Sequence, residues 1–265
     1  METIRQTAVA GLFYPDTGKA LDRAVQALLA KAPANPVRPK ALIVPHAGYA
    51  YSGPVAASAY ATLQSGADRI RRVILLGPTH RLALRGLALP DADAFATPLG
   101  LVAVDREAVR AIADLPQVQV NSAAHAQEHA LEVQLPFLQV LLGDFSLLPL
   151  AVGQATAEEV AQVLERLWGG EETLIVVSSD LSHYLSYDKA QVMDRATAHD
   201  ILRLQPLVSY EQACGSTPVN GLLLAAARRG LEPHLLDLRN SGDTSGDRHR
   251  VVGYAAFAFA QKAAS

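Results

Sequence analysis

Short unbroken apolar runs alternate along the chain with longer stretches in which apolar residues recur every three to four positions. The runs are typical of buried strands, and the periodic stretches are typical of amphipathic helices. We expect strands over 41–44, 73–76, 87–89, 145–152, 173–177, 234–238 and 251–259. We expect helices over 18–31, 53–63, 105–114, 127–142, 156–168, 188–203 and 220–229. This alternation predicts an α/β fold with a mainly parallel central sheet flanked by helices.

The 265 residues show no fixed repeat, no low-complexity tract and no long linker. The proline-rich stretch over 33–39 is too short to separate two domains. We therefore expect a single domain over residues 1–265.

Composition narrows the class of protein. Apolar residues make up 50% of the chain, enough for a sizeable core, and the net charge of −3 provides no basic field for nucleic acid. The sequence has no apolar run of about 18 residues, the minimum for a membrane span, and its start lacks the apolar stretch of a signal peptide. We expect a cytoplasmic protein.

The one cysteine, Cys214, rules out an internal disulfide and Cys-rich zinc modules, and a buried apolar role is favoured for it.

Three histidines follow apolar runs: His46, His80 and His183. In α/β proteins ligands bind beyond the carboxyl ends of parallel strands. We therefore expect these imidazoles to share one pocket, as a metal site or an acid/base site. Asp180 lies three residues before His183, where a carboxylate can orient an imidazole and raise its basicity. Capping of the next helix is the alternative role for Asp180.

A polar, glycine-rich loop over 240–247 separates the last two expected strands. It is either an exposed turn or the source of a carboxylate, Asp243, for the histidine pocket. Two imidazoles and one carboxylate resemble the facial triad that binds non-haem Fe(II). In the second case, Asp243 and two imidazoles of the pocket would be candidates for such a triad.

Residues 125–129 match the zinc-hydrolase pattern H-x-x-E-H, in which His125 and His129 share a zinc ion and Glu128 is the base. No downstream acidic ligand accompanies the pattern. Lining of the pocket is the favoured role for Glu128 and His129.

Several segments, taken together and in order, resemble the Memo family, also called AmmeMemoRadiSam system protein B. They are Arg5–Pro15, Pro45–Gly53, Gly77–His80, Glu128–Glu132, Leu135–Phe137, Ser179–Tyr184 and Cys214–Gly215. The family fold is similar to that of class III extradiol dioxygenases, which hold non-haem Fe(II) and open catechol rings. The resemblance implies that His46 and His80 are metal ligands and that His183 is the acid/base group, with Asp180 beside it.

The chain departs from the family at the third ligand. In the human member of the family this ligand is a cysteine near the C-terminus, and its position falls on or near Thr244 here. Asp243 is adjacent and is the expected substitute. Fe(II) is the favoured metal, with copper, zinc and a metal-free state as alternatives.

Three functions are compatible with these residues: a dioxygenase-type metal-dependent redox enzyme acting on a small molecule, a non-catalytic metal- or ligand-binding accessory protein, and a zinc hydrolase. The name of the family's prokaryotic members implies a radical-SAM protein and an AMMECR1-like protein as partners.

Overall fold

The computed structural model describes residues 3–244 and 246–262. The helices are α1 (Gly18–Lys31), α2 (Tyr49–Tyr60), α3 (Arg106–Ile112), α4 (Ala123–Ala126), α5 (Leu135–Leu142), α6 (Ala157–Arg166), α7 (Tyr187–Leu202) and α8 (Ser216–Arg229). Short 3-10 helices are η1 (Ala61–Arg69), η2 (Glu132–Gln134) and η3 (Ser241–Asp243). The strands are β1 (Ile4–Arg5), β2 (Ala41–Val44), β3 (Arg72–Pro78), β4 (Leu87–Leu89), β5 (Ala94–Thr97), β6 (Gly100–Ala103), β7 (Val118–Val120), β8 (Ser146–Val152), β9 (Thr173–Ser178), β10 (His183–Leu185), β11 (Leu231–Asn240) and β12 (Val251–Gln261).

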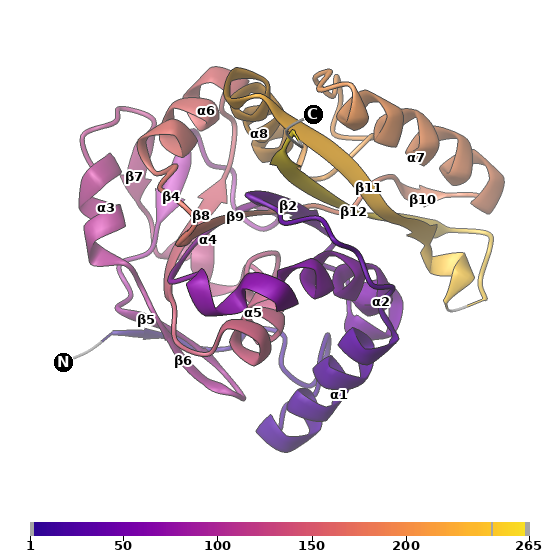
Figure 1. The fold of residues 1–265 in the computed structure, drawn as a ribbon, viewed down its shortest axis with the longest axis horizontal. Helices are drawn as coiled ribbons and strands as arrows, with labels where there is room; N and C mark the ends of the chain where they lie inside the picture. The colour runs from indigo at the N-terminus through magenta and orange to yellow at the C-terminus, as the bar shows by residue number, and fades with distance from the viewer. Residues whose placement is uncertain (1–2, 245, 263–265) are drawn as a thin grey trace.

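A nine-stranded sheet runs through the α/β domain in the order β10-β12-β2-β9-β3-β8-β4-β7, with β11 paired to β12 (Figure 1). The central strands β2, β9, β3 and β8 are parallel neighbours. Antiparallel pairs flank them on both sides, between β12 and β2 and between β4 and β8. The expected α/β class is confirmed, but the sheet is mixed, and its parallel part is the centre.

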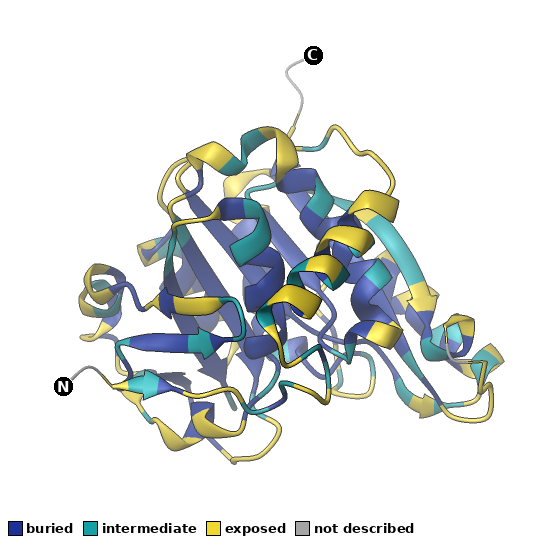
Figure 2. Cartoon of the chain, turned by 90° about the horizontal axis from the view of Figure 1, so that it is seen from below, coloured by how far each residue is buried: buried dark blue, intermediate teal, exposed yellow. Residues whose placement is uncertain are grey.

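The two faces of the sheet carry separate apolar cores. On β2, Leu42 and Val44 pack into one cluster, whereas Ala41 and Ile43 pack into the other. This alternation follows from the two-residue side-chain period of a strand. Helices α1, α2 and α5 cover the first face, and α6, α7 and α8 lie against the second (Figure 1). The central strands are buried, and exposed residues gather on the outer helix surfaces (Figure 2).

The structure corrects two expected helices and adds a small sheet. The helix expected over 53–63 begins earlier, at Tyr49, and changes to 3-10 geometry after Tyr60. The helix expected over 127–142 was wrong for its first part, because helical structure resumes only at Glu132. Strands β1, β5 and β6 form a three-stranded sheet at sites for which the sequence analysis expected no strand.

Helix α8 crosses α6 at Gly221, where a β-carbon would lie 2.2 Å from Val160 Cγ1. We expect Gly221→Ala to lower the free energy of unfolding by roughly 1–3 kcal/mol, the usual cost of overpacking a core. Urea denaturation measures this change. The control is Gly66→Ala, whose added carbon would come no closer than 3.6 Å to Arg69 and should change stability little. Equal stability of the two variants would contradict the close packing of these helices.

Candidate metal centre

Three neighbouring parallel strands end beside one another at the same edge of the sheet. Strands β2, β9 and β3 are adjacent in that order. Two residues beyond their last positions lie His46, Asp180 and His80, respectively. The shared position beyond the carboxyl ends of parallel strands is where α/β folds bind ligands.

Two of these residues join His129 in a group that could hold a metal ion. His46, His80 and His129 each offer one ring nitrogen, and these nitrogens lie within 4.8 Å of one another. The ring centroids are 5.2 Å apart for His46 and His80, and 4.8 Å apart for His80 and His129. His46 is buried, His129 half-buried and His80 exposed, so the group opens to solvent on the His80 side.

The hydrogen bonds of Ser178 assign the tautomer of His46. Ser178 Oγ donates its one hydrogen to the carbonyl of Ala130 at 2.6 Å and accepts from Gln134 Nε2 at 2.8 Å. The Nδ1 atom of His46 lies 2.9 Å from the same oxygen. Because the hydroxyl hydrogen is already used, Nδ1–H donates to Ser178, and Nε2 keeps its lone pair. His46 therefore presents Nε2 as a metal-binding atom.

The carboxylate of Glu128 prepares the other two imidazoles. Its Oε1 atom accepts from His80 Nδ1 at 2.9 Å and lies 3.3 Å from His129 Nδ1. A carboxylate on one ring nitrogen fixes the tautomer and leaves the other nitrogen for a metal. Glu128 also accepts from the backbone N–H groups of His80, His129 and Ala130.

The surroundings of His46, His129 and Glu128 keep these groups in the protonation states that a metal requires. It lowers the pKa of His46 to about 3, with a further contribution from the charge of His80. Burial likewise lowers the pKa of His129 to about 4, assisted by the charge of His46. Burial alone would raise the pKa of Glu128, but the hydrogen bond and charge of His80 lower it to about 2. Neutral imidazoles around an ionised carboxylate fit a divalent metal.

Arg5 supports the segment that carries Glu128 and His129. Its side chain donates to the carbonyl oxygens of His125 and Glu128, at 3.0 and 2.6 Å, and forms a buried ion pair with Glu132. Arg5 thus binds two carbonyl oxygens that a helix would otherwise use, and the Glu128 carboxylate binds the backbone N–H groups that follow. Residues 127–131 are therefore not helical. This local break is what brings His129 to the group.

Asp180 and His183 are the two residues that the sequence analysis predicted to perform acid/base chemistry. Asp180 Oδ1 accepts the backbone N–H of His46 at 2.8 Å, and its Oδ2 lies 3.9 Å from His46 Nε2. Burial raises the pKa of Asp180, although the His46 hydrogen bond and the charge of His183 oppose this. His183 Nδ1 lies 2.8 Å from the carbonyl of Leu181, to which it donates. In the neutral imidazole, the lone pair of His183 is therefore on Nε2.

The backbone beside His183 is strained. Tyr184 has a φ of +60°, which side-chain-bearing residues seldom adopt. It lies at an irregularity in the pairing of β10 with β12. Bulges and positive φ values often mark places where a fold aims a functional side chain.

The structure does not bring Asp243 or Thr244 into the histidine group. The Asp243 carboxylate accepts from Tyr187 Oη at 2.6 Å and from the backbone N–H of Asn240 at 3.0 Å. Thr244 is exposed and donates from Oγ1 to the carbonyl of Ser241. Among the residues described, the third member of the group is His129, which the sequence analysis had assigned to the pocket lining.

His125 faces away from this group. Its Nε2 atom donates to the carbonyl of Ala88 at 2.9 Å, and its ring packs edge-on against Phe95. Helix α4 ends at Ala126, so His125 and His129 do not share one helical face. This geometry does not favour the zinc-hydrolase pattern.

Cys214 is buried, as expected, but its place at the centre was missed. Its Sγ lies 3.3 Å from His46 Nε2. Burial raises the pKa of this thiol, and the charge of Asp180 adds to the effect. A thiol can therefore donate to the His46 lone pair when no metal is bound. Only the position of Cys214 just before a helix hinted at this.

The fold and the three-histidine group together define an α/β protein with a group of residues that could hold a metal ion beyond the carboxyl ends of its parallel strands. The family model for Memo-like proteins matches residues 5–258, so the chain belongs to the Memo-like family. Relatives described as MEMO1 family proteins include one from Aquifex aeolicus, 35% identical over 97% of this chain and 99% of its own length. Another, from Ignicoccus hospitalis, is 37% identical over 97% of this chain and 98% of its own.

Among solved structures, an uncharacterized protein from Escherichia coli K12 matches with a TM-score of 0.54 and 13% identity. The match covers 83% of this chain and 99% of that one. A likeness at this identity concerns the fold alone. No helix in the described part of the chain is long and apolar enough to cross a membrane.

Replacing Glu128 tests its effect on the metal ligands. We expect Glu128→Gln to weaken metal binding by roughly 10–100-fold, since the carboxylate orients His80 and raises its basicity. Competition with a coloured chelator measures the affinity. The control is Glu107→Gln, an exposed change whose partner, Arg72, begins β3 at the end opposite His80. Unaltered affinity in a folded Glu128→Gln protein would contradict this role.

Stability should depend on pH through the buried histidines. His46, His125 and His129 have lowered pKa values, of about 3, 4 and 4. An unfolded histidine titrates near about 6.5, so the unfolded state gains protons first as the pH falls. The stabilisation is present above about pH 6.5 and is lost towards about pH 4, by up to about 1.4 kcal/mol per pH unit for each histidine.

Urea denaturation of chelator-treated protein between about pH 7 and about pH 5 measures this loss. We expect His129→Gln to flatten the pH dependence, and we expect His199→Gln, at an exposed site, to leave it unchanged. A stability that stays constant over this range would contradict the neutral buried histidines.

Proposed function

We propose that the protein binds a divalent metal ion through His46, His80 and His129 and uses it in a dioxygenase-type redox reaction on a small organic molecule. The observation that carries this proposal is the approach of the three ring nitrogens to within 4.8 Å of one another. The tautomers support it, because Ser178 and Glu128 bind the Nδ1 atoms of His46 and His80, so that the lone pair of each ring lies on Nε2.

The metal would supply what amino acids lack: iron or copper provides one-electron chemistry for reactions with dioxygen, and zinc provides a Lewis acid. The three nitrogens suit copper and zinc as well as iron, because imidazole binds all three. Loading the protein with each metal in turn identifies the one that it binds.

The surrounding residues would bind the substrate and move its proton. His183 Nε2 has its lone pair available, because Nδ1 donates to Leu181, so it is the candidate general base. Burial raises the pKa of Asp180, so this carboxyl group releases a proton less readily than an exposed aspartate would. The exposed edge of His80 provides the side from which a substrate could enter.

An accessory protein that binds a metal or ligand without turnover is the second candidate. The 3.3 Å contact of Cys214 Sγ with His46 Nε2 favours it, because the thiol competes for the nitrogen that the metal needs. A radical-SAM protein and an AMMECR1-like protein remain the predicted partners.

The ligand set is tested by metal content. Protein stripped with a chelator and reloaded without oxygen with Fe(II), copper or zinc should bind about one ion per chain, as three convergent ligands would require. We expect His129→Ala to lose most of this affinity. We expect Asp243→Ala to keep it, because its carboxylate is bonded to Tyr187 and Asn240.

If Asp243→Ala instead loses most of the affinity and His129→Ala keeps it, Asp243 is the third ligand. Failure of the wild-type protein to bind any of the three metals would remove the basis of the proposal. For a protein that does bind metal, oxygen consumption with a catechol then separates enzyme from accessory protein. His183→Ala should bind metal normally and lose this activity, whereas metal-loaded wild type without turnover would favour the accessory role.

A further inference from the structure

A cavity lies at the other end of the strands that lead to the histidine group. It has a volume of about 710 Å³ and adjoins Lys40, which directly precedes β2, whereas His46 follows that strand. The loop between α6 and β9 and the far end of β12 complete its wall. Since strands rise about 3.3 Å per residue, roughly 20 Å separates Lys40 from His46 along the chain. The cavity and the histidine group are therefore distinct places.

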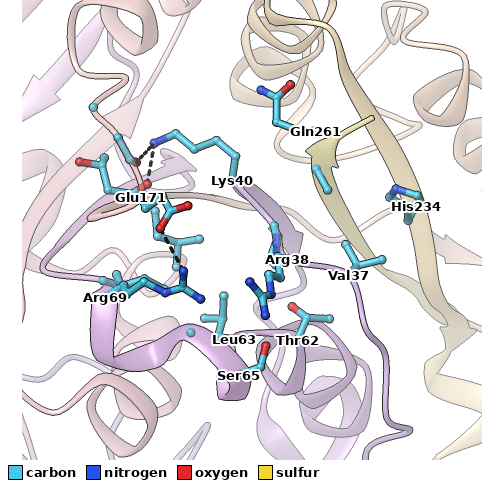
Figure 3. Close-up of a pocket in the computed structure, with 18 of the residues that line it drawn as sticks. Val37, Arg38, Lys40, Thr62, Leu63, Ser65, Arg69, Glu171, His234 and Gln261 are labelled. Atoms are coloured by element: carbon cyan, nitrogen blue, oxygen red, sulfur yellow. Dashed lines mark hydrogen bonds and ion pairs between the residues drawn. The ribbon is translucent and has the colours of Figure 1, made fainter. Parts of the chain in front are cut away.

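The cavity brings two arginines together. The guanidinium groups of Arg38 and Arg69 point toward one another across it, with Leu63 nearby (Figure 3). Arg69 pairs with Glu171 at 3.1 Å, but the Glu171 side chain is 80% exposed, so this pair is weak. Arg38 makes no hydrogen bond or ion pair with any residue that the structure describes. Two facing guanidinium groups repel each other unless an anion lies between them.

Lys40 adds a third positive charge at the same wall. Its ammonium group donates to the carbonyl oxygens of Gly170 and Thr173, each at 2.7 Å (Figure 3). These two bonds leave one of its three N–H donors unused. Burial lowers the pKa of Lys40 to about 8, and the charge of Arg229 contributes. Glu232, the other acidic residue of the lining, pairs with Lys262 at 3.5 Å. No carboxylate in the described lining neutralises Arg38.

The rest of the lining is largely apolar. Val37, Leu63, Ile70 and Leu174 contribute aliphatic side chains, and Trp168 forms part of the wall. The volume is within the range of small-molecule sites, roughly 300–1,000 Å³. A ligand that fits would place an apolar body on these residues and a negative group between the two arginines.

We propose that this cavity is a binding site for a small organic anion, a carboxylate or phosphate monoester with an apolar body. Arg38 is the principal anion-binding residue, because its planar guanidinium group can form two parallel hydrogen bonds with either group. Arg69 and Lys40 supply further positive charge. This inference is independent of the function proposed for the histidine group.

Octanoate and octyl phosphate are the probes, and titration calorimetry measures their binding. Octanol has the same apolar body without charge, and inorganic phosphate has the charge without the body. We expect one or both organic anions to bind saturably, at least roughly 10-fold more tightly than either comparison compound. If octanoate binds more tightly, the ligand is a carboxylate; if octyl phosphate binds more tightly, it is a phosphate monoester.

The single tryptophan of the chain is Trp168, so its fluorescence reports on this cavity alone. As the probe is added, the Trp168 fluorescence should saturate at the same probe concentration as the calorimetric signal. We expect Arg38→Ala to weaken binding by roughly 10-fold or more, the value of a charge-assisted hydrogen bond, and Arg38→Lys to retain part of the affinity. Arg203→Ala, an exposed change outside the lining, is the matched control and should bind as wild type.

Four results would overturn the proposal: no saturable binding of either organic anion, equal binding of octanol, equal binding of inorganic phosphate, or undiminished affinity in Arg38→Ala. Because His46→Ala should bind the probes normally, failure of the metal site would not affect this test. Loss of probe binding in His46→Ala would contradict the separation of the two sites.

Discussion

The buried carboxylate of Glu132 is the group on which the candidate metal centre depends. It is fully buried, and it accepts from Tyr14 Oη and from the backbone N–H groups of Ala8 and Val9, besides its ion pair with Arg5. A buried carboxylate without such partners would cost several kcal/mol. The N-terminal segment is therefore tied to the residues that follow His129, although more than 100 positions separate them in sequence.

This attachment explains how an apparently helical stretch can present a metal ligand. Arg5, held by Glu132, binds two carbonyl groups that a continuous helix would have used. Phe13, from the same N-terminal segment, packs against the His129 ring with centroids 4.9 Å apart. The cost of breaking the helix is thus offset by contacts with a distant part of the chain. The turn-rich start of the sequence is a structural part of the centre.

Local sequence rules could predict some of this arrangement but not all of it. His46 and His80 follow buried strands, and the rule for parallel strand ends placed them together because it depends only on strand order. His129 needed the helix break, which long-range contacts of Arg5 decide. Asp243 had suitable chemistry and a suitable loop, yet Tyr187 binds its carboxylate. The three-stranded sheet was missed because β5 pairs with the two-residue strand β1, too short to show a pattern.

Strand β2 links the three-histidine group to the cavity beside Lys40. Its four residues are all buried, with alternate side chains in the two cores, so it has little freedom to move independently. At its carboxyl end, burial favours neutral imidazoles and so suits a cation. At its amino end, Lys40 and the exposed connector before it place positive charge beside an apolar cavity and so suit an anion. The difference in character between the two ends of the strand thus follows from local burial and residue type.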